Sequence, residues 1–102
     1  MARVVVEPGV CGFTCRIEAV MMPNGLVAVT IESDCELVRE FAESFDAIDP
    51  VHQLYAADGD NPLHCHRCHH GCLVPIGVIK AVEAEAGLAL PRDAEIRFVR
   101  QR

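Results

Sequence analysis

Alternating hydrophobic and polar residues fill the first third of the chain and predict an antiparallel sheet. Residues 3–6 form a short β-branched run that a Glu-Pro-Gly segment ends. In residues 13–21 the apolar side chains at positions 13, 15, 17 and 19 share one face of a predicted strand. A Pro-Asn-Gly turn at 23–25 precedes a second alternating run, residues 26–31, so these two strands are predicted to form a hairpin.

Two later segments have helical periodicity. Ser33 and Glu36 match a capping box, in which the hydroxyl and the carboxylate satisfy the first unpaired amides of a helix. A second helix is predicted to begin near Pro75 and to end at Gly87, which suits a C-terminal cap. The side chains predicted to face the core are Leu37, Val38, Phe41, Ala42 and Phe45 in the first helix and Ile76, Val78, Ile79, Val82 and Ala86 in the second.

The remaining elements complete an α+β fold. Residues 51–57 suit a short helix, and residues 93–99 alternate again, which predicts a last strand with Ile96 and Phe98 facing inward. We therefore predict two layers: a mostly antiparallel sheet of about four strands with two to three helices on one face. Residues 1–102 are long enough for a single core, so one domain is expected.

Composition argues against several classes of partner. The formal net charge is -6 and Lys80 is the single lysine, so the chain offers no basic patch to a nucleic acid or an anionic membrane. The sequence contains neither an apolar run of transmembrane length nor a signal-peptide pattern, and we expect a cytoplasmic location. In that compartment clustered cysteines are more often ligands or catalysts than members of a disulfide framework.

Residues 63–72 read LHCHRCHHGC and hold three of the six cysteines and four of the five histidines. Thiolate and imidazole are the ligands that zinc prefers, and iron–sulfur clusters are held mainly by thiolates. Packing gives no reason to concentrate these residue types so strongly. We therefore interpret this segment as part of a metal or redox site.

Three cysteines lie near boundaries between predicted elements. Cys11 is in a glycine-flanked loop before a strand, Cys35 is in the first turn of a helix, and Cys72 shortly precedes the second helix. Helix amino termini favour thiolates, and the three positions can meet at one edge of the sheet. An imidazole would then complete a four-coordinate site. Cys15, on the apolar face of a strand, is interpreted as a core residue.

This order of cysteines resembles the NifU-type scaffold proteins of iron–sulfur cluster assembly. Cys11-Gly12 resembles their first cysteine and Cys35 their second, and either His64-Cys65 or His69 with Cys72 resembles the third position. The sequence departs from that family in having a phenylalanine where the scaffolds have aspartate after Cys-Gly, and in its predicted C-terminal strand. The resemblance implies an exchangeable cluster.

The chain is also similar to a small group of uncharacterised prokaryotic proteins. They share a Cys-Gly-Phe loop, an Asp-Cys helix start and a segment like residues 69–75, His-His-Gly-Cys-Leu-Val-Pro. This similarity implies a common fold and does not indicate an activity. It favours His69 and Cys72 as the ligands of the third position.

Our leading hypothesis is a small protein that binds zinc or an iron–sulfur cluster and carries it to or from an acceptor or donor protein. A homodimer with a shared site would fit equally well. The alternatives are a thiol redox protein that uses a Cys-x-x-Cys pair and a non-catalytic interaction module. Catalysis is disfavoured, because no oxyanion hole, nucleophile elbow or phosphate-binding loop accompanies the thiols. The expected central ligands are Cys11, Cys35, His69 and Cys72, with Cys65, Cys68 and His66 as auxiliary ligands or relay thiols.

Overall fold

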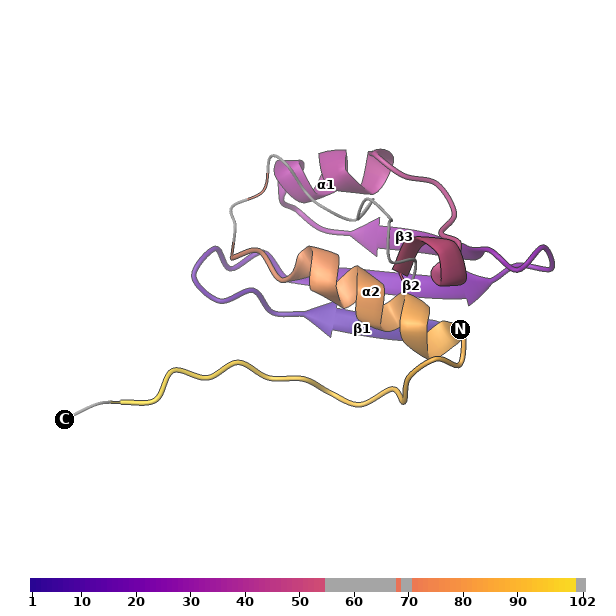
Figure 1. Cartoon of the computed structure of the whole chain (residues 1–102). Coiled ribbons are helices and arrows are strands. Elements are labelled where there is room, and N and C mark those ends of the chain that lie inside the picture. The colour runs from indigo at the N-terminus through magenta and orange to yellow at the C-terminus, as the bar shows by residue number, and fades with distance from the viewer. Residues whose placement is uncertain (55–67, 69–70, 101–102) are drawn as a thin grey trace.

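A computed structural model describes residues 1–54, 68 and 71–100. Within this part the strands are β1 (Ala2–Val6), β2 (Cys15–Met21) and β3 (Val27–Glu32), which form one antiparallel sheet in the order β1-β2-β3. The helices are α1 (Glu36–Glu43), a short π-helix η1 (Pro50–Leu54) and α2 (Val74–Glu85). Helix α2 covers one face of the sheet and α1 packs beside β3 (Figure 1). The predicted α+β class and the antiparallel sheet are confirmed.

The hairpin of β2 and β3 follows the sequence pattern closely. Cys15, Ile17 and Ala19 are buried on the helix side of β2, while the polar residues between them face solvent. At the turn, the amide of Gly25 donates a hydrogen bond of 3.0 Å to the carbonyl of Met22. Gly25 has a φ of 85°, a conformation that glycine adopts at little cost. The predicted turn and the inward face of β2 from position 15 onward are therefore confirmed.

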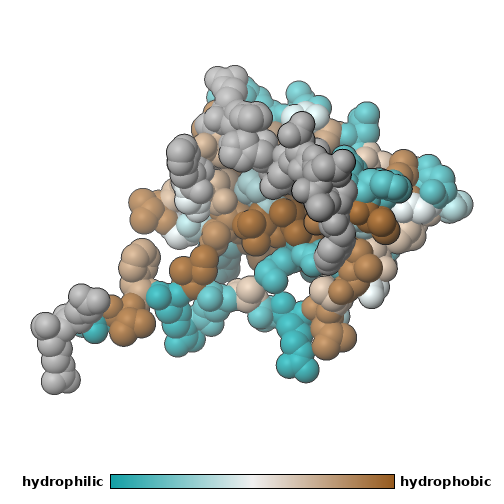
Figure 2. Space-filling model, viewed as in Figure 1, coloured by the Kyte–Doolittle hydropathy of each residue, from teal (hydrophilic) through white to brown (hydrophobic). Residues whose placement is uncertain are grey.

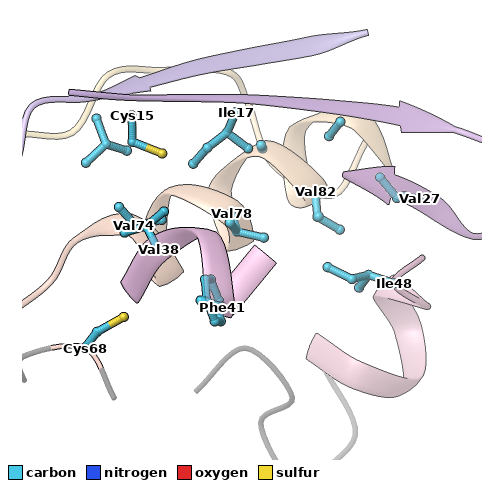
Figure 3. Packing of buried hydrophobic residues seen from close by; sticks show 13 residues of the cluster. Cys15, Ile17, Val27, Val38, Phe41, Ile48, Cys68, Val74, Val78 and Val82 are labelled. Atoms are coloured by element: carbon cyan, nitrogen blue, oxygen red, sulfur yellow. The ribbon is translucent and has the colours of Figure 1, made fainter. Parts of the chain in front are cut away.

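The core lies between the sheet and the helices (Figure 3). Helix α2 approaches the sheet most closely at Gly77. A Cβ atom at this position would lie 2.5 Å from Val6 Cγ2 and 3.0 Å from Ile17 Cδ1. The glycine therefore sets how closely α2 packs on β1 and β2.

Both ends of α2 are well defined. Pro75 lies in its first turn, as predicted. At the other end the amide of Leu88 donates to the carbonyl of Glu83 at 2.9 Å, and the amide of Gly87 donates to that of Ala84 at 3.2 Å. With a φ of 74° at Gly87, this is a Schellman motif and confirms the predicted glycine cap.

The end of α2 is also tied to the sheet through Glu85. Its Oε1 lies 3.2 Å from the amino group of Met1, and its Oε2 accepts a hydrogen bond of 2.7 Å from the amide of Met21. The chain that leaves α2 therefore starts beside the first residue of β1.

Three local expectations about the helices and the β2 strand were wrong. Helix α1 begins at Glu36 with Cys35 as its N-cap, so Ser33 does not form the capping box and instead accepts a hydrogen bond from the Cys35 amide. Ile76 is 51% exposed, because α2 turns Gly77 and Ala81 toward the sheet. Phe13 is exposed and lies before β2 begins.

The predicted strand at residues 93–99 is also wrong. Residues 91–100 have no regular secondary structure and are exposed throughout, and Figure 1 shows them leading away from the body of the molecule. Alternation reflects the β propensity of a segment, but a strand also needs an edge with which to pair. Within the described residues the sheet consists of β1, β2 and β3, and none of these strands pairs with this segment. We call residues 91–100 the C-terminal tail.

The short helix expected at 51–57 is matched in part by η1, and the rest of that prediction lies outside the described residues. In the part of the chain that the structure describes, no helix is long and apolar enough to cross a membrane.

Candidate functional site

The strand register brings several chain segments to one end of the sheet. Cys15, the first residue of β2, pairs with Val6 at the end of β1, and Arg16 pairs with Glu32 at the end of β3. Cys35 follows β3 by three residues. The start of β2 and the start of α1 therefore lie at the same end of the molecule.

Helix α2 begins at this end as well. Its first residue, Val74, is buried and lies near Cys15 and Val38 in Figure 3. Cys72 precedes this helix by two residues and packs, half-buried, against the core, as Cys35 does. Cys15, Cys35 and Cys72 are all free thiols. We call these three residues the thiol cluster.

The thiols of this cluster interact electrostatically. Burial raises the pKa of Cys15, and electrostatic interaction with Cys72 and Cys35 adds to the rise, which brings the pKa to about 11. Cys15 is therefore a neutral thiol at physiological pH. A bound cation would reverse this balance, because it would neutralise the thiolates that otherwise repel one another.

The backbone at Cys35 is held from both sides. Its amide donates to Ser33 Oγ at 3.1 Å, and its carbonyl accepts a hydrogen bond of 3.0 Å from the amide of Arg39. Arg39 Nε in turn donates to the Ser33 carbonyl at 2.9 Å, and its guanidinium lies 3.6 Å from Asp34 Oδ1. The Cys35 side chain makes no capping hydrogen bond. The fold thus fixes the position of this residue without engaging its thiol in capping.

Cys68 lies near the first turn of α1. Its side chain is buried, and its Sγ is 4.0 Å from the carbonyl oxygen of Leu37. Cys68 is disulfide-bonded. In this state it is not available as a metal ligand.

Cys11 lies in the connection between β1 and β2, at the same end of the molecule as the thiol cluster. This connection turns at two glycines with positive φ, and the Gly12 amide donates to the Gly9 carbonyl at 3.0 Å. The Cys11 side chain is exposed. The thiol that interacts with Cys35 and Cys72 is that of Cys15, which the sequence pattern had assigned to the core.

The sequence alone could not show that Cys15 lies beside the other two thiols, because this depends on the register of the strands. Its inward face was correctly predicted, and inward at this end means toward the starts of both helices. The expected ligands Cys65, His66 and His69 lie outside the described residues. Among the residues that are described, no three Cys, His, Asp or Glu side chains are arranged to hold a metal ion together.

Comparison with known proteins identifies the family. Residues 2–98 match the model of a family of unknown function (DUF6951), and the chain belongs to that family. No curated protein and no solved structure matches. The family domain extends from the first strand into the C-terminal tail as far as Phe98.

Proposed function

We propose that this protein binds a thiophilic metal centre, zinc or an iron–sulfur cluster, at the end of the sheet where Cys15, Cys35 and Cys72 lie. The observation that supports the proposal best is the convergence of three free thiols, one from the start of β2 and one from each of the segments that precede α1 and α2. Valine or alanine would fill the same space in a purely structural core. Soft metals select thiolate ligands, which gives this choice of residue a chemical reason.

The position of Cys35 and Cys72 leaves both thiols accessible to a ligand. Each residue lies just before the amino-terminal end of a helix, Cys35 before α1 and Cys72 before α2. Both are partly exposed, so a metal ion or a partner protein can approach them. Cys15 lies behind them in the core. Zinc would need a fourth ligand, and the His- and Cys-rich segment ending at Cys72 carries candidates, His69 first among them.

Metal binding has to rearrange this end of the molecule. Since no three ligand side chains among the described residues are placed around one point, the thiols must rotate inward when the ion arrives. A site that forms on binding and remains partly open suits a metal or cluster carrier better than a permanently closed structural site.

The direct test is to purify the full chain without oxygen and without a histidine tag, and to measure metal, acid-labile sulfide and visible absorption. Zinc near one equivalent without colour, or iron with sulfide and a charge-transfer band, is the expected result. Cys35→Ser and Cys72→Ser should each lose most of the metal while retaining the circular dichroism of the folded protein. Metal-free wild-type protein that also fails to take up zinc or a reconstituted cluster would overturn the proposal.

Cys11→Ser is the informative comparison variant, because Cys11 is an exposed thiol at the same end of the molecule. Unchanged metal content in this variant would place the ligands in the thiol cluster. Loss of metal would move one ligand to the loop between β1 and β2, as the resemblance to cluster scaffolds implies. His69→Ala tests the fourth ligand in the same way.

A second candidate function, thiol–disulfide exchange, rests on a different observation. Cys68 is disulfide-bonded next to α1, within a Cys-x-x-Cys sequence. Exchange would require a thiolate to attack this disulfide, and the protonated, buried Cys15 is poorly suited to that role. Free-thiol titration before and after mild reduction, with metal removed, tests the candidate. It predicts two additional thiols after reduction and a disulfide that re-forms readily in air.

A further inference from the structure

We propose that the C-terminal tail is a strand that pairs with the exposed edge of β1 in a second copy of this chain, so that two copies exchange their tails. The inference is independent of the metal site. It rests on the pattern of the tail, on its place in the fold and on the handedness of the connection that leads to it.

The tail has the pattern of a strand that is buried on one face. Ile96 and Phe98 alternate with Glu95 and Arg97, which form an ion pair with each other. Yet Ile96 is 76% exposed and Phe98 is fully exposed, and Figure 2 shows apolar side chains along the tail, apart from the body of the molecule. The family domain nevertheless includes the tail as far as Phe98. Large apolar side chains that stay exposed within a domain mark an interaction surface.

The complementary surface is the outer edge of β1. In the described part of the chain β1 pairs with β2 alone, so one edge of its backbone has no strand beside it. Val4 and Val6 point to the helix side, whereas Arg3 and Val5 point to solvent. A strand added here would place Ile96 and Phe98 beside the valines, and Glu95 on the face that carries Arg3. The apolar core would then extend by one strand.

Handedness argues that this strand comes from another copy. Glu85, the last residue of α2, lies beside Met1, and the tail that follows runs in the same direction as β1 and β3, with α2 in front of the sheet (Figure 1). Pairing with its own β1 would therefore make a parallel crossover from β3 through the helices to the far edge of the sheet. Viewed with the helices in front and the strands pointing up, that crossover moves to the left. It would be left-handed, whereas about 98% of such connections are right-handed.

A second copy removes this constraint. Each copy offers one tail and one free β1 edge, so a two-fold axis satisfies both at once and leaves neither exposed. When this axis is perpendicular to the strands, the tail lies antiparallel to the partner's β1, the same arrangement that the rest of the sheet uses. Each chain contributes two large exposed apolar side chains on one face of its tail to such an interface, Ile96 and Phe98.

The test combines solution mass with hydrogen exchange on the full-length chain. Light scattering coupled to gel filtration should give a dimer, and the amides of residues 93–99 and of β1 should be protected from exchange. Phe98→Glu should weaken dimerisation by about 100-fold or more, since two phenylalanines are lost from each dimer. The same variant should also lose protection in the tail. Val51→Glu is the matched control, because Val51 is an exposed apolar residue of η1, away from the β1 edge. It should remain dimeric.

Three results would overturn the proposal. A monomer with an unprotected tail would show that the tail is unpaired. A monomer with a protected tail would place the tail on its own sheet. A dimer that Phe98→Glu leaves intact would place the interface elsewhere.

Discussion

The contact of Gly77 with the sheet gives the sharpest prediction about the fold. In an exposed helical position, replacing glycine by alanine stabilises a protein by about 1 kcal/mol. At Gly77 the new Cβ would lie 2.5 Å from Val6 Cγ2 and 3.0 Å from Ile17 Cδ1, well inside van der Waals contact. Neither residue can withdraw easily, because both are buried and β-branched.

Overpacking of a core costs about 1–3 kcal/mol, and the short distance to Val6 places Gly77→Ala toward the upper end of that range. After subtraction of the gain in helix propensity, we expect a net loss of about 1–2 kcal/mol in the free energy of unfolding. Urea denaturation of both proteins, followed by circular dichroism, measures this difference.

The matched experiment is a double-mutant cycle with Val6→Ala. Val6→Ala removes the methyl group that the new Cβ would meet, so it should be less harmful in the Gly77→Ala background than in the wild type. A favourable coupling of about 1 kcal/mol or more is expected. If Gly77→Ala stabilises the protein, or if the two changes simply add, the close packing of α2 on β1 is not what requires the glycine.

Three further predictions concern the rest of the chain. In metal-free protein, the free energy of unfolding should fall by about 2 kcal/mol as the pH rises from 9 to 11, because the pKa of Cys15 is about 11 in the folded state, mainly through burial, against an ordinary value of 9.0. Cys15→Ala should flatten the pH dependence in this range when unfolding is measured by urea denaturation. The hydrogen bond from the Met21 amide, together with the N-terminal amine, lowers the pKa of Glu85 from its usual 4.5, so the stability that Glu85 contributes should be lost as the pH falls below 4.5. Glu85→Gln should therefore lose less free energy of unfolding than the wild type on acidification. Gly87→Ala should cost about 1 kcal/mol through backbone strain alone, since its φ is 74° and no atom lies near its Cβ position; equal stability by urea denaturation would contradict this.

The parts of the fold that sequence predicted are those that local physics determines. The hairpin turn at 23–25, the inward face of β2 and the glycine at the end of α2 each depend on a few adjacent residues. The errors came from tertiary choices. Alternation at 93–99 described a strand without saying whether its own sheet could receive it, and the periodicity of α2 could not tell which of two neighbouring faces would meet β1.

The candidate site divides in the same way. The sequence placed Cys35 and Cys72 near the starts of two helices, although the capping box expected at Ser33 does not form, and their meeting at one end of the sheet followed from the order of elements. Choosing between Cys11 and Cys15 required the register of β2 against β3. That register turns Cys15 toward the helix starts, whereas the glycine turns leave Cys11 exposed. Cys15 therefore packs in the core, as predicted, and also belongs to the candidate site.

The two proposals make separate demands on the molecule, and this separation can be tested. The thiol cluster is built within one chain, from the start of β2 and the segments before α1 and α2. The exchanged tail would add to β1 and contributes no cysteine or histidine. Phe98→Glu should therefore weaken the dimer and preserve the metal content per chain. Cys72→Ser should lose metal and remain dimeric. Loss of metal together with the dimer would mean that the two chains share the site, and the ligand set would then have to be assigned across the interface rather than within one chain.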